Sequence, residues 1–82
     1  MMRIEILYFA GIRELVKHDR ESIDLPEMIA IAQLREVLIQ RHRALEGRLV
    51  GVRFAIDERF VNDDASLHEG ARVALIPPVS GG

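Results

Sequence analysis

The sequence predicts an α+β fold in which a mixed sheet of four to five strands carries one main helix packed on one face. Two observations support this prediction. Apolar residues alternate with a period of two in short stretches near both ends of the chain, and one central stretch has the three- and four-residue spacing of a helix. With 82 residues, 49% of them hydrophobic and 29% charged, the chain is long enough for one domain with the composition of a globular protein.

The start of the chain predicts a hairpin. Residues 2–9 alternate, with Ile4, Ile6 and Tyr8 on one face, and predict the first strand. Gly11 ends this strand, and a short helical turn is predicted over residues 12–16. The alternating residues 22–25, closed by a proline, predict a second strand that pairs with the first.

A helix is predicted over residues 31–43. Its apolar positions recur at steps of three and four residues: Ile31, Leu34, Val37 and Leu38. Arg41, His42 and Arg43 fall in the predicted last turn, where positive charge complements the helix dipole, and Gly47 follows as a stop.

After the helix the period returns to two. A third strand is predicted over residues 50–56, with these residues on its core face: Val50, Val52, Phe54 and Ile56. Asp57 and Glu58 predict a turn into a short strand over residues 59–61, and Glu69-Gly70 a turn into a last strand over residues 72–76. This order of strands around one helix is the β-grasp arrangement.

Composition excludes several classes of function. The net charge is −2, with eleven basic residues scattered among thirteen acidic ones, which gives no electrostatic basis for binding nucleic acid. The chain has no cysteine, so it has no disulfide, thiolate zinc site or cysteine nucleophile. His18, His42 and His68 lack the spacing of metal ligands, so no metal site is expected. No apolar run is long enough to span a membrane and no signal peptide is evident, which predicts a cytoplasmic protein.

The last six residues, PPVSGG, are expected to form a tail (77–82) on a domain of residues 1–76. Pro77 and Pro78 stiffen the chain in an extended form. Gly81 and Gly82 have no side chain, which suits either a frayed end or a tip that enters a narrow site.

Two segments carry a resemblance to a known family. FAGIRELV at residues 9–16, which has the pattern FAxxRELV, and LHEGARVALIPPVSGG at residues 67–82 resemble the small subunit of molybdopterin synthase. That family consists of ubiquitin-like β-grasp sulfur carriers. By position, the resemblance implies that Gly82 carries the sulfur, with Gly81, Ser80 and Val79 lining the slot that receives the tail.

The resemblance also implies a set of partners. A ubiquitin-activating-like adenylyltransferase uses ATP to adenylate the terminal carboxylate, and a sulfurtransferase or cysteine desulfurase supplies the sulfur of the resulting thiocarboxylate. The tail then delivers sulfur to cyclic pyranopterin monophosphate in the large subunit, within a heterotetramer, and two deliveries form the dithiolene of molybdopterin. The chain itself is expected to bind no cofactor.

Four apolar residues, Leu7, Phe9, Phe60 and Ile76, are expected on the outward face of the sheet or its neighbouring turn. Because the first and last strands of a β-grasp sheet are adjacent, these residues are expected to form one patch, and the resemblance implies that the large subunit docks there with the prolines of the tail. Arg13 is either a partner of Glu14 in a surface ion pair or a contact for the activating enzyme.

Asp63 and Asp64 are expected to shape a loop.

Two alternative functions are compatible with the sequence. One is a sulfur carrier for thiazole, cysteine or tRNA thiolation, with the same tail chemistry. The other is a β-grasp interaction module without covalent chemistry.

Overall fold

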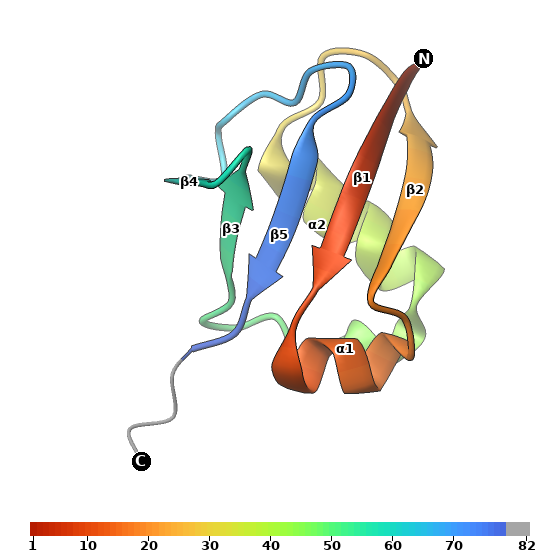
Figure 1. Ribbon diagram of the computed structural model, residues 1–82, viewed down its shortest axis with the longest axis vertical. Helices are drawn as coiled ribbons and strands as arrows, with labels where there is room; N and C mark the ends of the chain where they lie inside the picture. Colours follow the sequence, from red (N-terminus) through yellow and green to blue (C-terminus); the bar gives the residue numbers. More distant parts are fainter. Residues whose placement is uncertain (79–82) are drawn as a thin grey trace.

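The computed structural model describes residues 1–78 (Figure 1). Along the chain its elements are β1 (Met2–Tyr8), α1 (Ala10–Val16), β2 (Arg20–Leu25), α2 (Ile31–Arg41), the 3-10 helix η1 (Arg43–Leu45), β3 (Arg53–Ile56), β4 (Arg59–Val61) and β5 (Arg72–Ile76). The order of the strands, α1 and α2 is the one predicted from the sequence, and η1 was not predicted.

The strands form one mixed sheet in the order β2-β1-β5-β3-β4. β1 and β5 are parallel neighbours, and the other three pairs are antiparallel. In Figure 1, α2 crosses behind the sheet and α1 lies at the end of the sheet where β1 and β5 finish. The predicted α+β fold, the first hairpin and the adjacency of the first and last strands are therefore confirmed.

The core lies between the sheet and α2. Ile31, Leu34 and Leu38 of the helix are completely buried, and so are the inward residues Val73 and Leu75 of β5. On transfer data, burying each such side chain contributes roughly 1.5–3 kcal/mol relative to leaving it exposed. Ile4, Ile6 and Tyr8 of β1 are buried as well, so the predicted inward faces of β1 and β5 are confirmed.

The main helix ends two residues earlier than predicted. His42 has extended backbone angles and the side chain contacts Glu21 of β2, so the chain leaves the helical path there and continues as η1. Of the three basic residues predicted in the last turn, only Arg41 lies in it. The helix end was missed because the residue that stops it does so through a contact with a distant strand.

The third strand begins at Arg53, not at residue 50 as predicted. Val52 N–H donates to the Leu49 carbonyl at 3.1 Å, which closes a tight turn with Gly51 at a positive φ of 80°. Val50 lies at the corner of this turn and is 87% exposed. Its assignment to the core face was wrong because the alternation of apolar residues runs on through a turn.

Within residues 1–78, the structure contains no helix with the length and apolar character needed to cross a membrane.

Candidate functional site: an apolar patch and the stem of the tail

A row of four side chains crosses the sheet on the face opposite α2. Leu7 of β1 pairs with Ala74 of β5, Ala74 pairs with Ala55 of β3, and Ala55 pairs with Phe60 of β4. Residues paired in register between neighbouring strands project from the same face of the sheet. The two middle members are alanines, whose side chains are short. The surface along the row is therefore hollowed at its centre and raised at Leu7 and Phe60, its two ends.

The row forms the floor of a hollow of about 310 Å3, with Phe9 and Ile76 among the residues that line it. Phe9 and Phe60 are 45% and 55% exposed, which is unusual for phenylalanine. We call the set Leu7, Phe9, Ala55, Phe60, Ala74 and Ile76 the apolar patch. The structure thus brings together the four residues that the sequence singled out, and their role in docking stays a prediction.

Charged side chains border the apolar patch. The Arg53 guanidinium lies 4.2 Å from the centroid of the Phe60 ring, in a cation–π arrangement. Arg72 lines the hollow and pairs with Glu5 at 3.3 Å. A polar rim around an apolar centre is the usual anatomy of a protein–protein interface.

The first two residues of the tail, Pro77 and Pro78, which we call the stem, begin next to the apolar patch. β5 ends at Ile76, which lines the apolar patch, and Pro77 and Pro78 follow directly. Both prolines also line a groove on the α1 side, together with Ile12, Leu15 and other residues. The predicted tip residues, Val79, Ser80, Gly81 and Gly82, lie outside the described residues.

Arg13 is exposed on α1, and its partner is not the predicted one. Its guanidinium lies 3.7 Å from the Asp19 carboxylate, so the expected pair with Glu14 was wrong. Asp19 is nearer because the chain turns back after α1 towards β2. A contact between Arg13 and an activating enzyme stays a prediction.

Asp63 shapes its loop, as expected. Its carboxylate accepts a hydrogen bond from Arg35 at 2.6 Å, and its carbonyl accepts one from Ala32 N–H at 2.9 Å. These two contacts attach the loop before β5 to the start of α2.

A partly buried polar cluster joins three elements. The Glu21 carboxylate of β2 accepts hydrogen bonds from Tyr8 of β1 and Arg41 of α2, and it contacts His42. Burial favours the neutral acid, but the donors outweigh it and lower the pKa of Glu21 to about 2. Burial and the bond to Glu21 raise the pKa of Tyr8. This cluster was not predicted, because Glu21 is 13 or more residues from each of its partners in the sequence.

Asp57 and His68 form a second, exposed pair. The Asp57 carboxylate accepts from Arg72 N–H at 3.0 Å and pairs with His68 Nε2 at 2.8 Å, and these two bonds lower its pKa. The Glu69 carbonyl at 3.0 Å, and then Asp57, raise the pKa of His68. With both ring nitrogens engaged by oxygen acceptors, this histidine ties the turn after β3 to the loop before β5.

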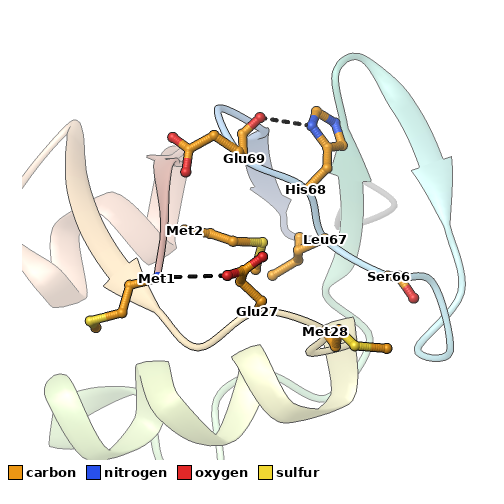
Figure 2. Close-up of a pocket in the computed structure, with 8 residues that line it drawn as sticks. All are labelled: Met1, Met2, Glu27, Met28, Ser66, Leu67, His68 and Glu69. Atoms are coloured by element: carbon orange, nitrogen blue, oxygen red, sulfur yellow. Dashed lines mark hydrogen bonds and ion pairs between the residues drawn. The ribbon is translucent and has the colours of Figure 1, made fainter.

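The structure has another pocket, of about 500 Å3, at the end of the sheet away from the stem (Figure 2). Its lining includes Met2 and Leu67, and the Met1 amine lies 3.8 Å from the Glu27 carboxylate. In Figure 2 the Met1 and Met28 side chains point away from each other on either side of Glu27. Of the residues predicted to dock a partner, those that the structure describes all lie elsewhere, so this pocket is not the candidate site.

The two alanines of the apolar patch are the site residues that sequence reasoning missed. Their signal was a small residue at an outward position on each of two strands, Ala55 and Ala74. Only the antiparallel register of β3 and β5 shows that they face each other and leave the hollow.

Comparison with known proteins gives a consistent result. The model of the ThiS family matches residues 6–82. The chain is 37% identical to the molybdopterin synthase sulfur carrier subunit of Escherichia coli (strain K12), over 96% of this chain and 99% of that protein. It is 34% identical to the subunit of the same name from Chlamydomonas reinhardtii, over 99% of this chain and 100% of that protein.

Two solved structures share the fold. A putative molybdopterin converting factor subunit 1 from Pyrococcus furiosus superimposes with a TM-score of 0.87 and 30% identity, over 96% of this chain and all of that one. The complex of subunits 1 and 2 of the molybdopterin-converting factor from Helicobacter pylori contains a chain with a TM-score of 0.71 and 24% identity, over 99% of this chain and all of that one.

Proposed function

Because this chain belongs to the ThiS family, we propose that it is the sulfur carrier subunit of molybdopterin synthase, in the biosynthesis of the molybdenum cofactor. Relatives with that name match it at 34% and 37% identity over nearly the whole of both sequences. The structural observation that carries the proposal is the position of Ile76, which lines the apolar patch and is followed directly by the stem. A partner that covers the patch therefore lies where the tail leaves the sheet.

The proposed reaction begins with activation of the Gly82 carboxylate. A carboxylate is a poor electrophile, so the activating enzyme joins one of its oxygens to the α-phosphorus of ATP, and pyrophosphate leaves. A hydrosulfide equivalent from a donor protein then attacks the acyl carbon and AMP leaves, so that a C–S bond replaces a C–O bond. The chain contributes the acyl group and the partner binds the ATP.

Delivery of the sulfur is proposed to occur in the large subunit. The Helicobacter pylori structure shows subunits 1 and 2 of that molybdopterin-converting factor in one complex, which supports a large-subunit partner for this chain. The apolar patch docks this partner, and the tail places the Gly82 thiocarboxylate against cyclic pyranopterin monophosphate. Two deliveries form the dithiolene, and the carrier is the sulfur-donating part of a sulfurtransferase complex in a heterotetramer.

The glycines at the tip suit this chemistry for a steric reason. The same two residues must enter the active sites of at least two enzymes, and a side chain on either would limit the closest approach. The prolines of the stem reduce the conformational entropy that is lost when the tip is held. A location of this reaction in the cytoplasm is part of the proposal.

Intact mass spectrometry tests the carrier chemistry. After incubation with an activating enzyme, ATP and a sulfur donor, we expect a gain of about 16 Da, the difference between one sulfur and one oxygen. The matched control is the chain without Gly82, which should show no gain. If the full chain shows no gain either, it is not a covalent carrier.

A second measurement identifies the acceptor pathway. The thiocarboxylated chain, mixed with a large synthase subunit and cyclic pyranopterin monophosphate, should produce molybdopterin. A chain that gains the mass but produces no molybdopterin would be a carrier for a different pathway.

A further inference from the structure

A tight turn beside the stem sets the direction in which the tail leaves the domain. The turn spans residues 49–52 and is closed by the hydrogen bond from Val52 N–H to the Leu49 carbonyl. Gly51 has a φ of +80° at the third position, which is where a type II turn requires glycine. Leu49 and Val52 at its two ends are buried, so the turn is fixed to the core.

The Pro78 ring lies directly against this turn. A Cβ placed on Gly51 would be 3.6 Å from Pro78 Cγ and 3.9 Å from Pro78 Cβ, which is van der Waals contact. Because Gly51 has no side chain, nothing from this residue fills the space between the turn and the Pro78 ring. Pro77 is half-buried and Pro78 is exposed, and both line a groove together with Val50 and Val52 of the turn.

Residues 79–82 follow Pro78, and fully extended these four residues reach roughly 14 Å at most. Ordering each of them costs about 1–2 kcal/mol of backbone entropy. In the proposed carrier the reacting carbon belongs to Gly82, so its position depends on the direction that Pro78 gives to these four residues.

We propose that Gly51 is a positioning residue for sulfur delivery: the turn at residues 49–52 holds Pro78 and so aims the tip of the tail into the partner's active site. This inference rests on the proposed function. Gly51 acts through Pro78 and touches neither substrate nor the reacting carbon.

The test compares two leucine variants. Gly51→Leu extends a side chain into the space of the Pro78 ring, whereas a Cβ on Gly70 meets nothing within 4 Å. Gly70 has nearly the same φ, +78°, and lies in the turn before β5, at the other end of that strand from the stem. Gly70→Leu therefore carries the same backbone strain without a contact to the tail.

Each variant is converted to the thiocarboxylate and its sulfur delivery to the large subunit is followed. For Gly51→Leu we expect kcat to fall about tenfold, because small displacements of a reacting group cost large factors in rate. KM for the carrier should change less than about twofold, since the apolar patch is unaltered. For Gly70→Leu we expect kcat to stay at the wild-type value, although both variants should melt at a lower temperature.

Two proline variants complete the test. Pro78→Ala removes the ring and should lower kcat about two- to fivefold, in line with the entropic worth of a compatible proline. In the double variant with Gly51→Leu the effects should not add, because the leucine then has no ring to displace. Equal kcat values for the two leucine variants would overturn the inference while leaving the proposed function intact. A wild-type thiocarboxylate that delivers no sulfur would overturn the proposed function, and this inference with it.

Discussion

Ala55 and Ala74 face each other across β3 and β5 at the centre of the open sheet face. Leu7 and Phe60 stand at the two ends of the same row, so the surface is concave where a flat sheet face would otherwise be. A concave apolar surface with exposed aromatic side chains at its edge can accept an apolar side chain from a partner, and buried contacts of this kind carry much of the energy of an interface.

Lysine substitutions in the apolar patch test its role. For Phe9→Lys or Ile76→Lys, we expect the dissociation constant for the large subunit to rise about tenfold or more, because a charge must then be desolvated at the interface. Adenylation of Gly82 should continue. Calorimetry measures the first quantity and release of pyrophosphate the second.

Met28→Lys is the matched control for these variants. Met28 is 90% exposed but lies at the other pocket, away from the apolar patch. It should bind the large subunit as the wild type does. Equal loss of binding and adenylation in the patch variants would show that the patch is misplaced.

At the scale of elements, Glu21 joins β2 to β1 and to the end of α2. Its side chain is 16% exposed, and its carboxylate accepts hydrogen bonds from Tyr8 and Arg41. These contacts tie an edge strand to the helix that covers the sheet, which is a connection that backbone hydrogen bonds alone do not make.

The low pKa of Glu21 predicts how stability depends on pH. The folded-state pKa is about 2 and the ordinary value is 4.5. The charged carboxylate therefore stabilises the fold fully above about pH 4.5, and this contribution is lost as the pH falls towards 2. The contribution is about 2 kcal/mol, after allowing for partial exposure of the group.

Urea unfolding of the wild type and Glu21→Gln between pH 2 and 6 measures this contribution, a range that brackets the values above. The variant should be less stable at pH 6, and the difference between the two proteins should shrink as the pH falls. A difference that stays constant over this range would contradict the assignment of the pKa shift to Glu21.

Sequence patterns predicted the elements better than their ends or their partners. The type and order of the five strands, α1 and α2 followed from spacing and turn residues, because these depend on neighbours within a few positions. The 3-10 helix η1 was not predicted. The end of α2 depends on a contact from His42 to Glu21, and the exposure of Val50 depends on a turn that the alternation concealed. The first is determined by a residue that is distant in the sequence, and the second by the backbone geometry of the turn.

The candidate site also contains residues that the sequence predicts and residues that only the structure reveals. Leu7, Phe9, Phe60 and Ile76 could be predicted because each is apolar at an outward or turn position. The alanines at the centre of the apolar patch could not, since a small outward residue means nothing until the strand register is known. The position of Pro78 beside Gly51 likewise brings together two segments, the stem and the turn at residues 49–52, that no local pattern relates.

At the scale of the whole molecule, one face of the sheet forms the core and the other carries the surface proposed to bind a partner. Its inner face is buried against α2, and its open face carries the apolar patch and continues into the stem at Ile76. Partner contacts can therefore change without altering the core.

This separation predicts the effect of changing the tip. Deletion of Gly82, or Gly81→Leu, should abolish activation or sulfur delivery and leave the melting temperature unchanged. As a contrast, Leu75→Ala removes a completely buried side chain and should lower the free energy of unfolding by about 2–5 kcal/mol. Scanning calorimetry and the mass assay together measure both effects. A fall in melting temperature for the tip variants would mean that the tail packs on its own domain.

The position of β5 has a mechanical consequence. This strand is hydrogen-bonded on both sides, to β1 and to β3, and the stem continues from its end. A partner that draws in the tail and later releases it pulls on β5 close to the direction of the strand. Such a load is shared by the bonds to both neighbours at once, whereas an edge strand has only one row of bonds to resist it. The stem therefore continues from a strand held by two rows of hydrogen bonds, which suits the proposed carrier, whose tail is held and released in every sulfur delivery.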